Sequence, residues 1–122
     1  MQITPDYNPT AALKGVSILL MDAQSVDETK GTVVCPGMGI RDHTFTIEVS
    51  ANVTGKIQLE TASDPAYTGI WAPLGGGTID LSLIGAAGAI EVQFSNMAIV
   101  AARPRIETVV VGGTATVRYT GQ

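Results

Sequence analysis

The residues that could carry out chemistry are few, and none has the partners that a reaction needs. His43 is the only histidine and follows Asp42, and Cys35 is the only cysteine. A His–Asp contact without a nucleophile is only an ion pair, and a zinc site needs three or four Cys or His ligands. We therefore expect His43 at the surface or in an interface. We expect Cys35, in an apolar run after Val34, to be a small core residue without a disulfide.

The acidic residues form no recognisable acid–base pair or metal site. Asp22, Asp27 and Glu28 could bind calcium loosely, but their spacing does not match a helix–loop calcium site. A solvated loop is the simpler interpretation. Glu60 and Glu91 fall on the polar side of alternating segments, where we expect solvent. The sequence thus predicts no catalytic residue, no metal and no cofactor, and the protein is not expected to be an enzyme.

Two neighbouring aromatic residues, Tyr67 and Trp71, could bind a partner or a ligand. Exposed aromatic rings on a β-sandwich can stack on sugars, but such platforms generally use several rings. This chain has one Trp, three Tyr and two Phe in all. We expect Trp71 to be an anchor in the core or in an interface. A carbohydrate-binding β-sandwich stays as an alternative function.

The composition points to protein partners more than to nucleic acid or membrane. Hydrophobic residues make up 45% and charged residues 15%, against about 25% charged in an ordinary soluble domain. We expect other chains to bury part of this surface, or else a Thr/Ser-rich surface to face solvent. Arg103 and Arg105 are the densest basic pair in a chain of net charge −4, too small for a phosphate-binding patch. Residues 81–90 are too short and too glycine-broken to span a bilayer.

The chain divides into an N-terminal arm and one domain. Residues 1–13 read as an extended arm because two prolines block regular pairing. Such an arm either frays or lies on a neighbouring subunit. Residues 14–122 are long enough for one self-sufficient core, and the start of the chain has no signal-peptide pattern, which predicts synthesis in the cytoplasm. The partner contacts that we expect are Ile3, Pro5, Tyr7 and Pro9 in the arm, with Tyr67 and Trp71 in the domain.

From residue 14 onward, short alternating segments follow one another at the spacing of about 8–12 residues that is typical of a sandwich or barrel. We predict a single antiparallel β-sandwich or jelly-roll-like barrel of about 8–9 short strands. Residues 44–51 and 56–61 are expected to form a hairpin. Residues 70–74 are expected to be a strand that a flexible triglycine turn at 75–77 separates from another over 78–83. The side chains expected to face the core are Phe45, Ile47, Val49, Ile57, Leu59, Ile90, Val92, Phe94, Ala115, Val117 and Tyr119.

Two stretches of the chain carry a resemblance to a known class. The first runs Ile-x-Leu-Glu, then Ser63, Asp64 and Pro65, then Tyr67, Trp71 and Leu74. The second comprises Arg-Pro-Arg-Ile-x-Thr at 103–108 and Gly-Gly-Thr-Ala-Thr-Val at 112–117. Over about residues 45–120, this pattern resembles small β-sandwich structural proteins of tailed bacteriophages.

The resemblance implies a virion protein, and the small size favours a head decoration or cement protein. Such a protein would be a homotrimer that braces major capsid proteins on the capsid surface, after synthesis in the host cytoplasm. A tail, neck or baseplate component is the alternative within the same class. Low charge, an arm with apolar anchors and the lack of an active-site pattern agree with either role.

Overall fold

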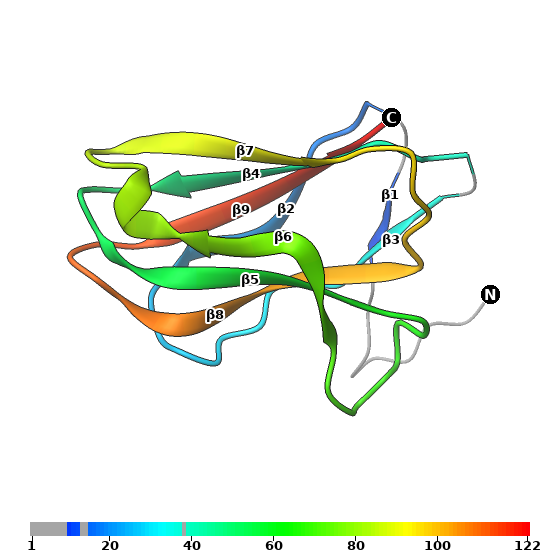
Figure 1. Ribbon diagram of the computed structural model, residues 1–122, viewed down its shortest axis with the longest axis horizontal. Helices are drawn as coiled ribbons and strands as arrows, with labels where there is room; N and C mark the ends of the chain where they lie inside the picture. The colour runs from blue at the N-terminus through cyan, green and yellow to red at the C-terminus, as the bar shows by residue number, and fades with distance from the viewer. Residues whose placement is uncertain (1–9, 13–14, 38) are drawn as a thin grey trace.

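The computed structural model describes residues 10–12, 15–37 and 39–122, and it confirms the prediction of an all-β sandwich. Two sheets pack face to face (Figure 1). One has the strand order β1-β3-β8-β5-β6 and the other β2-β9-β4-β7; among the described residues, every pairing is antiparallel except that of β1 with β3. The elements are β1 (Thr10–Ala12), β2 (Ile18–Gln24), β3 (Val34–Pro36), β4 (His43–Val49), β5 (Thr54–Ala62), β6 (Ala72–Asp80), the 3-10 helix η1 (Leu81–Leu83), β7 (Gly88–Phe94), β8 (Ala101–Val111) and β9 (Ala115–Gly121).

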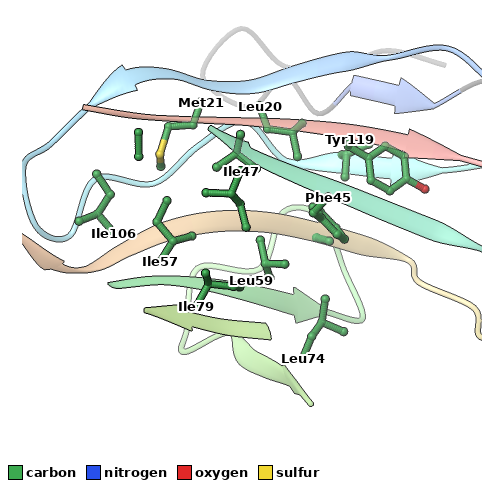
Figure 2. Close-up of a cluster of buried hydrophobic side chains, with 14 of the residues drawn as sticks. Leu20, Met21, Phe45, Ile47, Ile57, Leu59, Leu74, Ile79, Ile106 and Tyr119 are labelled. Carbon is green, nitrogen blue, oxygen red and sulfur yellow. The ribbon is translucent and has the colours of Figure 1, made fainter. Parts of the chain in front are cut away.

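The core lies between the two sheets and follows the predicted alternation. Phe45 and Ile47 of β4 point inward beside Val117 and Tyr119 of β9, and all four are fully buried. Figure 2 shows Ile47 and Phe45 pointing toward Ile57 and Leu59 of the facing sheet, and Ile106 belongs to the same cluster. Removing a large apolar side chain from water contributes about 1.5–3 kcal/mol each, so this layer holds the sheets together. The inward-facing residues predicted on β4, β5 and β9 are all confirmed: Phe45, Ile47, Val49, Ile57, Leu59, Ala115, Val117 and Tyr119.

The predicted hairpin of residues 44–51 with 56–61 is wrong. Strand β4 pairs with β7 and β9, whereas β5 pairs with β6 and β8 in the other sheet. The chain crosses between sheets after β4, and Val53 is buried in the core at the crossing. Ser50 is tied to Thr114 by two hydrogen bonds, of 3.0 Å from its backbone N–H and 2.8 Å to its hydroxyl. Alternation identifies the buried face of a strand but not the strand beside it.

The triglycine segment is not a turn between two strands, as predicted, but part of β6. Three residues of β5, Gln58 to Glu60, are opposite six residues of β6, Pro73 to Thr78, so the extra residues form a bulge. Gly76 has a φ of 79°, which glycine adopts without strain. Strand β6 ends at Asp80, whose carboxylate accepts hydrogen bonds from the backbone and hydroxyl of Ser82 and begins η1. The predicted strand over 78–83 is therefore wrong in its second half.

Two of the side chains expected to face the core on β7 are less buried than predicted. Phe94 is buried, Val92 is partly buried and Ile90 is exposed. The reason is that β7 is an edge strand, paired only with β4, so one of its sides has no neighbouring strand.

Part of the predicted arm has a defined position in the structure. Thr10–Ala12 forms β1, which pairs in parallel with β3 of the same chain at the edge of the five-stranded sheet. The other arm contacts that we predicted, Ile3, Pro5, Tyr7 and Pro9, lie outside the described residues.

Candidate interaction surface

The loop between β5 and β6, residues 63–71, has a defined shape set by hydrogen bonds within it. The Asp64 carboxylate accepts from the backbone of Ala66 at 2.9 Å, and the Asp64 carbonyl accepts from the backbone of Tyr67 at 3.0 Å. The indole N–H of Trp71 then donates to the carbonyl of Tyr67 at 2.9 Å. These bonds fix the two aromatic residues relative to each other, as a turn initiated by Asp-Pro favours.

Trp71 is buried but lies outside the core between the sheets, and its expected contact with a partner stays a prediction. Its side chain is only 3% exposed, yet it does not belong to the inter-sheet cluster. The guanidinium carbon of Arg103 lies 4.2 Å from the centre of its ring, a cation–π contact. Because Arg103 and the loop cover the indole, Tyr67 is the one member of this aromatic pair that presents ring surface to solvent.

Glu60 is buried, not solvated as the alternation predicted. It is 2% exposed and accepts hydrogen bonds from Arg103 Nε at 2.7 Å, Arg105 Nε at 3.1 Å and Gln58 Nε2 at 3.2 Å. Arg105 also donates from Nη1 to Glu28 at 2.9 Å, so Glu28 is paired and not only solvated. Glu60 does point to the outer face of its sheet, but the 63–71 loop and the two arginines cover that face.

The sequence contains one signal for the cluster of Glu60, Arg103 and Arg105. Arg103 and Arg105 alternate along β8, which places both side chains on one face of the sheet. In the register of β5 with β8, Glu60 is opposite Arg103 and Gln58 is opposite Arg105. Opposite charges in facing positions of neighbouring strands stabilise a sheet. The sequence could not reveal the pairing because the order of the strands was unknown.

Ile70 is the most exposed large apolar side chain among the described residues, at 92%. It lies between two open depressions. The apolar one is lined by half-exposed Tyr67 and Val100, with Ala72 and Ala98. The basic one lies over Trp71 and contains Lys30, Arg103 and Arg105 with Glu28 and Glu60. We call Tyr67, Ile70, Val100, Lys30, Arg103 and Arg105 the loop-63 surface.

The basic depression has a positive balance in an acidic protein. Its three cations exceed its two carboxylates by one charge, whereas the whole chain has a net charge of −4. The hydrogen bonds of Arg103 within the described part of the chain use only Nε. A guanidinium group can bind a carboxylate in a bidentate manner.

His43 is buried, and the expectation that it lies at the surface or in an interface is wrong. Its Nε2 lies 2.9 Å from the carbonyl of Met97, and its Nδ1 lies 2.7 Å from the hydroxyl of Tyr119. Because a carbonyl only accepts, Nε2 carries a proton, and in the neutral ring Nδ1 accepts from Tyr119. The hydrogen bond between His43 and Tyr119 satisfies one polar group of each side chain, inside an aromatic cluster that includes Phe45. It is a structural element of the core.

Cys35 is half-buried in β3 and forms no disulfide. Burial raises the pKa of its thiol, which lowers the thiolate fraction that a nucleophile needs. Across residues 10–12, 15–37 and 39–122, no three His, Cys, Asp or Glu side chains are grouped so that they could hold a metal ion. The same residues contain no helix that is long and apolar enough to cross a membrane.

Compared with models of known protein families and with curated proteins, the chain matches none.

Proposed function

We propose that this protein is a non-enzymatic structural protein of a tailed-bacteriophage virion, and that it acts by binding other protein subunits. The observation that carries the proposal is the loop-63 surface, where Ile70 projects into solvent from a loop fixed by hydrogen bonds. A large apolar side chain on a fixed loop costs little conformational entropy when a partner covers it. The assignment to a virion rests on the resemblance of residues 45–120 to phage β-sandwich proteins.

Within the virion, the specific role that we propose is capsid decoration. The protein would brace major capsid proteins on the head surface and associate with itself, as a homotrimer, after synthesis in the host cytoplasm. Many weak contacts repeated over a capsid lattice give strong overall binding by avidity. The ion cluster of Glu60, Arg103 and Arg105 supports this role because it stiffens the sheet beneath the contact surface.

Quantitative mass spectrometry of purified particles that contain this protein tests the proposal. Decoration requires a copy number comparable to that of the major capsid protein. A few copies per particle would assign the protein to the tail, neck or baseplate instead. Absence from purified particles that contain all other virion proteins would overturn the proposed function altogether.

A further inference from the structure

We propose that the loop-63 surface binds the N-terminal residues 1–9 of a neighbouring copy of this chain, so that the copies join head to tail in a closed ring. The inference deepens the proposed function, on whose self-association it rests. It names the partner of this surface and the segment that makes the contact.

The chemistry of the surface requires a segment with an apolar side chain next to a carboxylate. Ile70 offers an aliphatic contact between the two depressions, and Tyr67 and Val100 extend it on the apolar side. On the other side, the basic depression, lined by Lys30, Arg103 and Arg105, can take one carboxylate.

Residues 1–9 supply this combination. Their sequence, MQITPDYNP, has one carboxylate, at Asp6, and no lysine or arginine. Ile3 and Tyr7 are the large apolar and aromatic side chains that flank the carboxylate. Pro5 and Pro9 restrict the backbone to extended conformations and reduce the entropy lost on binding. The charge of Asp6 complements the excess positive charge of the basic depression.

A neighbouring copy is the partner that we propose because the proposed function rests on self-association. Residue 9 joins β1 at one edge of the five-stranded sheet, whereas the 63–71 loop joins β5 to β6 at the opposite edge. From β1 to β5 is three strand spacings, about 14 Å, and nine extended residues span about 30 Å, so a segment of this length can reach the surface on its own chain or on a neighbour. The mass in solution distinguishes the two. An arm of one copy on the loop-63 surface of the next is a heterologous contact, which forms a ring when the rotation between copies closes, and a trimer is the smallest such ring beyond a dimer.

The mass in solution by light scattering is the first test, with full-length variants that change exposed residues. Wild type is expected to be a trimer. Asp6→Lys reverses the arm charge and Ile70→Asp removes the apolar contact, so both should give mainly monomer that still unfolds in one cooperative transition. Leu83→Asp is the matched control: Leu83 is 80% exposed on η1, away from this surface, and its variant should stay trimeric.

A synthetic peptide of residues 1–9 with a C-terminal amide identifies the contact directly. It should bind the Asp6→Lys protein in calorimetry, and an Asp6→Asn peptide should bind at least about tenfold more weakly, as loss of one charge-assisted contact requires. The Ile70→Asp substitution, added to the Asp6→Lys protein, should abolish binding of the wild-type peptide.

Three results would overturn the inference. One is a trimer that survives both Asp6→Lys and Ile70→Asp. Another is peptide binding that is indifferent to Ile70→Asp. The third is a monomeric wild type, which would mean that the segment does not join neighbouring copies, even if the peptide binds. None of these three results requires purified virus particles. A protein that is abundant on the head could therefore still fail the test of this inference. A trimer joined by its arms could likewise be absent from the virion, which would overturn only the proposed function.

Discussion

A single carboxylate, that of Glu60, holds two arginines against the outer face of the five-stranded sheet. The side chains of Arg103 and Arg105 are only 14% and 17% exposed. Arg103 therefore depends on Glu60 to compensate a charge that water reaches only in part, and Arg105 depends on Glu60 together with Glu28. Burial of such a group is favourable only while its partners stay in place.

We expect Glu60→Ala to lower the free energy of unfolding by about 3 kcal/mol. This is the lower end of the range for breaking a buried ion pair, because both arginine side chains remain partly exposed to solvent. Urea denaturation measures the change. Glu48→Ala is the control, since Glu48 pairs with Arg118 at 3.0 Å with both side chains nearly half exposed, and its loss should cost under about 1 kcal/mol. Equal costs for the two variants would contradict the buried character of the Glu60 cluster.

The hydroxyl of Tyr119 gives the fold a dependence on alkaline pH. Burial raises the pKa of Tyr119 from its usual 10.0 to about 12, so the folded state holds this proton more tightly than the unfolded state. The contribution to stability is complete below pH 10 and is lost as the pH rises toward 12, by about 1.4 kcal/mol per pH unit.

Urea denaturation at pH 9, 10 and 11 should show this loss in the wild type. Tyr119→Phe should be less stable at pH 9, since His43 Nδ1 loses its donor, but its stability should fall less steeply above pH 10. A slope that is the same in both proteins would show that other groups cause the alkaline loss.

Two glycines in the strands, Gly55 and Gly75, differ in how much space surrounds them. Gly55 has a φ of 123°, beside register shifts in the pairing of β5 with β8. A Cβ atom there would lie 2.6 Å from the carbonyl oxygen of Val109, a backbone atom that cannot move aside. Gly75, in the bulge of the edge strand β6, has nothing within 4 Å of the corresponding position.

Gly55→Ala is therefore expected to destabilise the protein by about 2–3 kcal/mol, from backbone strain and the clash together. Gly75→Ala should change the stability by less than about 0.5 kcal/mol. Thermal unfolding of the two variants side by side checks the prediction. A large loss at Gly75 would mean that the bulge must stay flexible, contrary to its open surroundings.

At the scale of the whole molecule, we expect the sandwich to fold without residues 1–9. All the core residues that the structure describes lie within residues 15–37 and 39–122, and β1 adds three residues at one edge. The low share of charged residues in the chain leaves more of the surface to apolar side chains, and ten large hydrophobic side chains are exposed among the described residues. Several of these, including Val26 and Val111, lie far from the 63–71 loop in the sequence.

Deletion of residues 2–9 should leave a folded sandwich, with a melting temperature within a few degrees of the wild type, because the described core residues all lie outside the deleted segment. Calorimetry checks this, and retention of β1 avoids an unpaired edge at β3. Loss of a cooperative transition in the truncated protein would show that the arm belongs to the folding unit.

The sequence by itself determined the fold class and the inward faces of β4, β5 and β9. Period-two alternation reports which face of a strand is buried, and that information is local. Only the tertiary structure decided which strands pair, that the chain crosses between sheets at Val53, and that Glu60 and His43 are buried. Those outcomes depend on strands that are distant in the chain: Arg103 covers Glu60, and Tyr119 and Met97 enclose His43. A polar residue is buried when such partners satisfy its hydrogen bonds, and local sequence does not encode the positions of those partners.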